Sequence, residues 1–114
     1  MKFKMNDLNW EIRELPQYAI KEKMNKRKNK DEDDVNSISE RYYGVTFNDE
    51  LLILLDCDLP EDRKRKTLIH ELTHCYIGCY MTHLEKNYIE EDIADIISNS
   101  FDIIKKIVEK YFKD

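Results

Sequence analysis

The chain has 114 residues, of which 41% are hydrophobic and 38% are charged, and its formal net charge is −5 at pH 7. This length predicts one domain, residues 1–114, with a single modest core. The negative charge argues against direct binding of nucleic acid, and no apolar run is long enough to span a membrane. The first residues lack the long apolar stretch of a secretion signal, so we expect a cytoplasmic protein.

The N-terminal part predicts a strand followed by a helix. Residues Leu8–Leu15 alternate apolar and polar side chains, as a half-buried strand does, and Pro16 ends the run. A short helix is expected over 17–29. Residues 21–40 contain a basic run followed directly by an acidic run, and this pattern predicts a mobile charged connection.

The middle of the chain predicts a β-hairpin. Residues 41–47 and 50–56 are rich in strand-forming side chains, and Asn48 and Asp49 between them are turn formers. The second of these segments is apolar nearly throughout. We therefore expect both of its faces to be covered.

Two helices are expected in the C-terminal half. The first begins near Asp58, a candidate cap, and runs to about Gly78. The second runs from Tyr88 to about Phe112, with acids at its start and lysines near its end. The fold class is therefore α+β: a small antiparallel sheet of about three strands, packed on the first helix and on a long C-terminal helix. The apolar stripe of that last helix comprises Ile89, Ile93, Ile96, Ile97, Ile104, Ile107, Val108 and Tyr111.

The cysteines predict a reduced protein. There are three, so they cannot all pair internally. Cys75 and Cys79 lie four residues apart on the first helix, in its apolar stripe, and are expected to be reduced core residues. Cys57 stands alone, whereas a cysteine metal site would need two close pairs.

The first helix contains the motif His70-Glu71-Leu72-Thr73-His74, an HExxH sequence. Residues four apart share one helix face, so His70 and His74 can direct two imidazole nitrogens at one ion. Glu71 is offset by about 100° and is placed to act as general base on a metal-bound water. This chemistry favours Zn²⁺. The simpler alternative is two surface histidines with a bystander glutamate.

A catalytic zinc ion usually has a third protein ligand. The residues that could supply it are Glu90, Glu91, Asp92, Asp95 and His83. Glu91 and Asp95 share one helix face beside small residues, so we predict Glu91 as the ligand. Asp95 would then accept a hydrogen bond from a metal-bound imidazole. His83 is its main rival, although the spacing does not match the metzincin pattern HExxHxxGxxH.

The HExxH motif followed by Glu91 and Asp95 resembles the gluzincin pattern, in which ExxxD follows on a second helix. More closely, residues 66–74 with 90–92 resemble small phage and mobile-element proteins of the ImmA/IrrE-type metallopeptidase family. The resemblance covers about 42–104. It implies a minimal zincin-like domain with zinc bound by His70, His74 and Glu91, and with Glu71 as base. Larger members cleave repressor proteins, so a repressor-type substrate in a bacterial cytoplasm is one expectation.

The function predicted from the sequence is a zinc-dependent metallopeptidase that hydrolyses a protein or peptide substrate. Its tetrahedral intermediate would need a second hydrogen-bond donor besides the metal. Tyr88, His83, Tyr42 and Tyr43 are candidates for that role. An apolar strand before the motif helix could pair with an extended substrate. The alternative is a non-catalytic, metal-stabilised peptidase-like module that binds a phage or host protein. The sequence does not indicate an oligomeric state.

Overall fold

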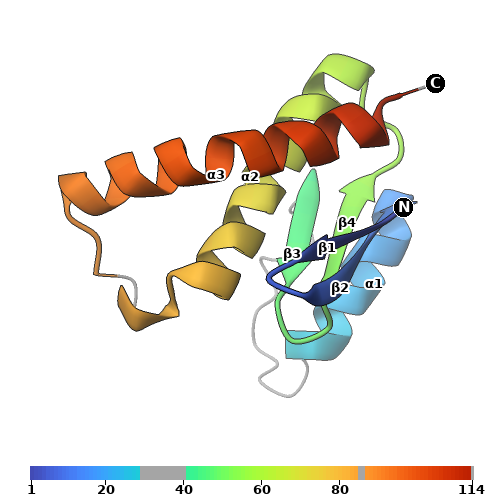
Figure 1. Cartoon of the computed structure of the whole chain (residues 1–114). Coiled ribbons are helices and arrows are strands. Elements are labelled where there is room, and N and C mark those ends of the chain that lie inside the picture. Colours follow the sequence, from blue (N-terminus) through green and yellow to red (C-terminus); the bar gives the residue numbers. More distant parts are fainter. Residues whose placement is uncertain (29–40, 85–86, 114) are drawn as a thin grey trace.

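The computed structural model describes residues 1–28, 41–84 and 87–113, and it confirms an α+β fold. A four-stranded sheet has helix α1 on one side and helix α2 on the other, and helix α3 lies across α2 (Figure 1). The elements are β1 (Lys2–Met5), β2 (Leu8–Leu15), α1 (Gln17–Lys28), β3 (Gly44–Phe47), β4 (Leu52–Asp56), α2 (Glu61–Tyr80), a short 3₁₀ helix η3 (Thr82–Leu84) and α3 (Glu90–Tyr111). No helix in these ranges is long and apolar enough to cross a membrane.

The sheet differs from the predicted antiparallel sheet of about three strands. Its order is β1-β2-β4-β3, and β2 runs parallel to β4 while the other pairs are antiparallel. The additional strand is β1, in which Phe3 and Met5 are buried and Lys2 and Lys4 are exposed. It joins β2 through Asn6 and Asp7, which both have positive φ as a tight hairpin turn requires. In the sequence, α1 lies between β2 and the β3–β4 hairpin. This longer connection allows β4 to run parallel to β2.

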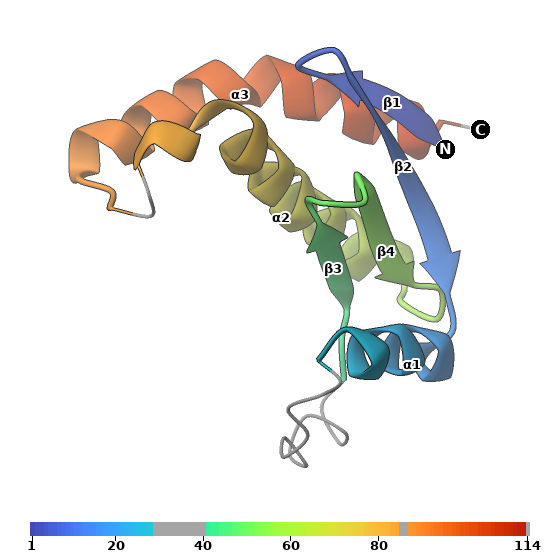
Figure 2. The same cartoon turned by 90° about the horizontal axis from the view of Figure 1, so that it is seen from below.

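The expectation that the second hairpin strand is covered on both faces is confirmed. Strand β4 lies between β2 and β3 (Figure 2), and all of its residues are buried. Ile53 and Leu55 join the cluster under α2, whereas Leu52 and Leu54 join a cluster with Ile20 of α1. Alternate side chains of a strand point to opposite faces, so one continuous apolar run is needed to contact both helices.

Helix α2 packs on the sheet through a buried stripe that includes Leu68, Leu72 and Cys75. Burial of each large aliphatic side chain is worth about 1.5–3 kcal/mol, so this face fixes the position of the motif helix. The predicted core position of Cys75 is confirmed. Asp58 is not the cap: α2 begins at Glu61, with Pro60 at the N-cap position and no side-chain cap. The Asp58 backbone N–H donates to the Asp56 carboxylate in the turn before the helix.

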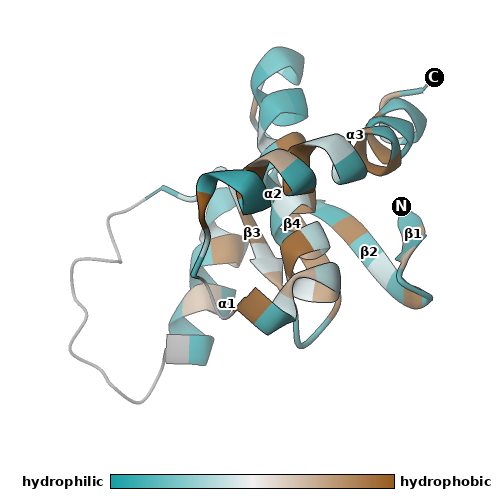
Figure 3. Ribbon diagram, turned by 60° about the vertical axis from the view of Figure 1, so that its left-hand side comes forward, coloured by the Kyte–Doolittle hydropathy of each residue, from teal (hydrophilic) through white to brown (hydrophobic). Residues whose placement is uncertain are grey.

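The apolar stripe of α3 is only half buried. Ile104, Ile107 and Val108 lie in the core. Ile89, Ile93 and Ile97 on the same stripe are 66%, 48% and 63% exposed. Hydrophobic and hydrophilic bands alternate along the helix (Figure 3), but of the isoleucines in its N-terminal half only Ile96 is buried. The N-terminal half extends past α2 (Figure 1).

The helix predicted over 17–29 is confirmed as α1, and it includes the first part of the charged connection expected over 21–40. Residues up to Lys28 belong to α1, and Lys23 and Arg27 form ion pairs with Glu50 at 2.8 and 2.5 Å. These long side chains also cover the ring of Phe47, so this basic segment is anchored to the turn of the second hairpin. Residues 29–40 lie outside the described residues.

Candidate metal centre

The two histidines of the HExxH motif lie side by side on α2, as their spacing predicts. The Nε2 atoms of His70 and His74 are 3.3 Å apart, and both side chains are exposed. Their rings meet at an interplanar angle of 73°. Both nitrogens therefore converge on one point outside the helix.

This separation fits a shared zinc ion. Two nitrogens bound to tetrahedral Zn²⁺ at about 2.0–2.1 Å are themselves about 3.3–3.4 Å apart, and the observed distance is 3.3 Å. The same distance also allows an N–H···N hydrogen bond between two neutral imidazoles when no metal is bound. The donor set and its geometry are therefore compatible with zinc.

Glu71 has the environment that a general base in such a site requires. Its side chain is only 6% exposed, and its Oε1 accepts a hydrogen bond of 2.6 Å from the Thr46 hydroxyl. No second donor contacts its Oε2 within 1–28, 41–84 and 87–113. Thr46 thus fixes one oxygen of the carboxylate. Thr46 is not among the site residues predicted from the sequence, because its only sequence signal is its place in a predicted strand before the motif helix.

A cleft runs between α2 and β3 at this point. A cavity of about 300 Å³ is lined by Gly44, Val45, Thr46, Asn48, His70, Glu71 and His74. Strand and helix approach closely at Gly44, where a Cβ atom would lie 2.7 Å from Thr67 Cγ2 and 3.1 Å from Glu71 Cγ. A larger residue here would force the side chains of Thr67 and Glu71 to shift.

β3 is the edge strand of the sheet on the side of the cleft. The Asp56 N–H donates to the Tyr43 carbonyl at 2.9 Å, so Tyr43 and then every second residue bonds inward to β4. The N–H and C=O groups of Gly44 and Thr46 consequently point outward. The strand predicted to pair with a substrate was the apolar one, now β4, and that prediction is wrong because β4 has partners on both sides.

Among residues 1–28, 41–84 and 87–113, the structure brings no third ligand to the two histidines. Glu91 and Asp95 are exposed on the N-terminal half of α3, and His83 is exposed in η3. Among the described residues, just one group of three or more ligand atoms lies within 4.8 Å of one another, and it includes none of these. Glu91 as the third ligand therefore stays a prediction. Asp92 has a different role, because its Oδ2 accepts a hydrogen bond from the backbone N–H of Ile89 and caps α3.

The candidates for stabilising the intermediate are distributed around the fold. Tyr88 packs against the main core cluster, and Tyr42 packs against the cluster beneath α1. Tyr43 is exposed, and its ring lies 5.3 Å from the guanidinium of Arg41 and 5.1 Å from that of Arg63. Of the tyrosines, Tyr42 and Tyr43 both line a cavity that reaches His70 and Glu71. Among the described residues, none of the four candidates forms a hydrogen bond with His70 or His74.

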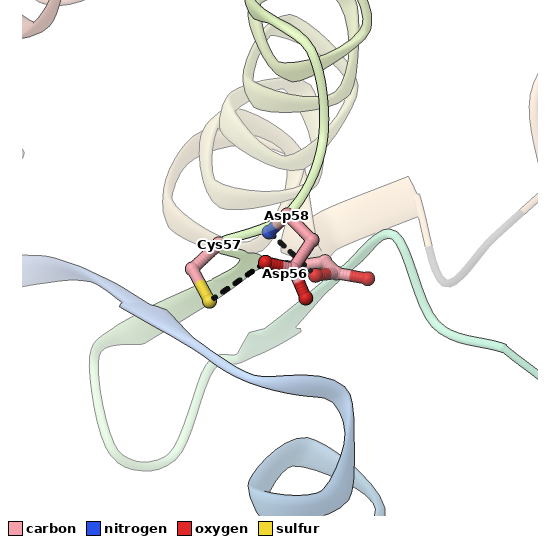
Figure 4. A group of neighbouring side chains, drawn as sticks. All are labelled: Asp56, Cys57 and Asp58. Atoms are coloured by element: carbon pink, nitrogen blue, oxygen red, sulfur yellow. Dashed lines mark hydrogen bonds between the residues drawn. The ribbon is translucent and has the colours of Figure 1, made fainter.

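The group that does satisfy the distance criterion is Asp56, Cys57 and Asp58 (Figure 4). Asp56 is buried and already accepts from Arg41 at 2.8 and 3.0 Å and from Gln17 at 2.8 Å. Burial opposes its ionisation, but the Asp58 N–H, Arg41 and Gln17 outweigh this and hold the pKa of Asp56 below its usual value. Burial and the neighbouring carboxylates raise the pKa of the Cys57 thiol. A cation here would have to displace Arg41 and bind the Cys57 thiolate, whose formation is disfavoured by the raised pKa. We therefore interpret this group as structural.

Comparison with protein-family models, curated proteins and solved structures found no match to this chain. Its function is therefore argued from its own residues.

Proposed function

We propose that this protein is a zinc-dependent peptidase whose metal is held by His70 and His74 and whose general base is Glu71. One observation carries the proposal. The two Nε2 atoms stand 3.3 Å apart, beside a buried carboxylate that an edge strand orients across a cleft. A bystander pair of surface histidines would not need this arrangement.

Zinc bound there would polarise a peptide carbonyl and lower the pKa of a water molecule. Glu71 supplies the proton transfers. Its free Oε2 faces no competing donor in the described residues, so it can accept the proton of the attacking water and pass it to the leaving amine. Thr46 holds Oε1 meanwhile, which keeps the carboxylate from rotating away.

The edge strand supports a peptide as the substrate. The outward N–H and C=O groups of Gly44 and Thr46 can form a β-ladder with an extended chain. Such a chain would lie along the cleft beside His70 and Glu71. The resemblance to ImmA/IrrE-type proteins makes a repressor-type protein a candidate substrate.

The third ligand is part of the proposal. Glu91 is the residue we assign to it, with Asp95 beside it on the same face of α3. The N-terminal half of α3 buries one isoleucine, Ile96, whereas the C-terminal half buries Ile104, Ile107 and Val108. A modest rearrangement of that half is therefore less costly than one of the buried C-terminal half.

Elemental analysis tests the metal site. Wild-type protein purified without chelators should hold zinc near stoichiometry, and His70→Ala should hold almost none. Glu91→Ala should lose most of its zinc while the neighbouring Glu90→Ala retains it. Wild-type protein that binds no zinc after addition and dialysis would refute the proposal, whereas zinc retained in Glu91→Ala would move only the third ligand.

Hydrolysis of a quenched fluorescent peptide library tests the chemistry. Wild-type protein should cleave members of the library, and Glu71→Gln should keep its zinc and lose turnover. The second candidate function is a metal-stabilised binding module without catalysis, which would use the same two histidines as metal ligands. Zinc binding without any cleavage, with a closed site of four protein ligands, would establish that alternative.

A further inference from the structure

A second, larger cavity adjoins the candidate metal centre. Its volume is about 690 Å³, and it shares Gly44, His70 and Glu71 with the smaller cavity. From the motif it extends along α2 towards the N-terminal end of that helix. Its walls also include Arg41, Tyr43, Arg63, Lys66 and Asp62.

The charge of this cavity is opposite to that of the whole chain. Three cations, Arg41, Arg63 and Lys66, and two carboxylates, Asp62 and Glu71, line it, so the formal charge of the lining is +1, whereas the chain carries a net charge of −5. Lys66 lies one helical turn before His70, and Arg63 lies one turn before Lys66. Within 1–28, 41–84 and 87–113, neither Arg63 nor Lys66 forms an ion pair.

Two of the cations are held in position. The buried carboxylate of Asp56 accepts from Nε and Nη2 of Arg41, so this guanidinium is fixed at the cavity wall. The guanidinium carbons of Arg41 and Arg63 lie 5.3 and 5.1 Å from the centre of the Tyr43 ring. Cation–π contact with this shared ring limits how far either side chain can move. A prearranged cationic wall binds an anion without first losing side-chain entropy.

We propose that this wall, formed by Arg41, Arg63 and Lys66, binds a carboxylate of the substrate close to the scissile bond. The planar guanidinium of Arg63 fits a carboxylate in two-point contact, and Arg41, whose Nε and Nη2 donate to Asp56, retains Nη1 as a donor. A peptide supplies the carboxylate as an Asp or Glu side chain or as its free C-terminus. The inference rests on the proposed peptidase function, and it names the substrate class of that site: acidic peptides.

The test uses matched peptides and matched variants. Quenched fluorescent peptides with amidated C-termini carry Glu or Gln at each position around the cleavage site, and a third set has Gln throughout and a free C-terminal carboxylate. Arg63→Gln combined with Lys66→Gln removes two cations from the wall. Lys106→Gln combined with Lys110→Gln removes the same charge from exposed positions of α3 outside the cavity.

We expect wild-type protein to prefer one Glu peptide over its Gln counterpart by roughly tenfold or more in kcat/KM, the factor expected for a charge-assisted hydrogen bond. The Arg63/Lys66 variant should lose that preference, and the Lys106/Lys110 variant should keep it. A preference seen only with the free C-terminus would support the same wall with a terminal carboxylate as its ligand.

A binding measurement distinguishes failure of this inference from failure of the proposed function. The same peptides are titrated onto Glu71→Gln by fluorescence polarisation, which needs no turnover. Cleavage of Glu and Gln peptides at equal rates would overturn the carboxylate assignment and leave the peptidase intact. Absence of cleavage with no difference in binding would overturn both. Tighter binding of a phosphoserine peptide than of the Glu peptide would replace the carboxylate by a phosphate.

Discussion

The hydrogen bond between Thr46 and Glu71 links the edge strand to the candidate base, and its strength can be measured without a substrate. The Thr46 hydroxyl has one proton, and its 2.6 Å contact with Oε1 is shorter than its 3.2 Å contact with the Glu71 carbonyl. A hydrogen bond to a charged group is worth about 1.5–3 kcal/mol, and a buried acceptor left without a donor costs a similar amount. Thr46→Val keeps the branched shape that suits a strand. It should therefore lower the free energy of unfolding by about 1.5–3 kcal/mol.

A double-mutant cycle in urea isolates this contact. Thr46→Val is measured in the wild type and in Glu71→Ala, where the carboxylate is absent and the substitution should have little effect. Thr46→Ser, which keeps the hydroxyl, serves as the control and should retain the coupling. A coupling energy below about 0.5 kcal/mol, the usual scatter of such cycles, would refute the role of Thr46. Thr46→Val should also keep its zinc but lose activity, because the substitution disturbs only the general base, Glu71.

Two further predictions concern stability. The pKa of Asp56 is lowered in the folded state, so its ionised form stabilises the fold above the unfolded pKa of about 3.9. This contribution is lost as the pH falls through the folded pKa. Urea midpoints measured from pH 7 down to pH 2 should therefore fall less steeply for Asp56→Asn than for the wild type, and parallel curves would contradict this. Ile107→Ala should cost about 2–5 kcal/mol because Ile107 is buried, whereas Ile97→Ala on the exposed half of α3 should change stability by less than about 0.5 kcal/mol in the same assay.

Local patterns predicted most of the elements. The alternation in Leu8–Leu15 became β2, and the unbroken apolar run before Cys57 became the central strand β4. The convergence of His70 and His74 also follows from helix geometry alone, because both lie on one rigid element. In these cases the period of the side chains and the structure they form span the same few residues.

Non-local features were not predictable in this way. The pattern Lys2-Phe3-Lys4-Met5 is too short to distinguish a strand from an irregular segment. Nothing in a strand's own sequence states whether its neighbour is parallel, so the pairing of β2 with β4 was missed. Thr46 has no sequence signal as a partner of Glu71, since the contact depends on how closely β3 approaches α2 at Gly44.

The contrast between His74 and Glu91 shows where sequence reasoning about this site ends. The distance between the two histidines is fixed by one turn of α2, but the distance from Glu91 to either histidine depends on the angle at which α3 crosses α2. That angle is set by burial of Ile104, Ile107 and Val108 at the other end of α3. A small tilt there moves the first turn of a 22-residue helix by several times as much. Occupancy of the metal centre should therefore respond to substitutions at the α2–α3 contact that touch no ligand, because that contact governs whether Glu91 can reach the metal.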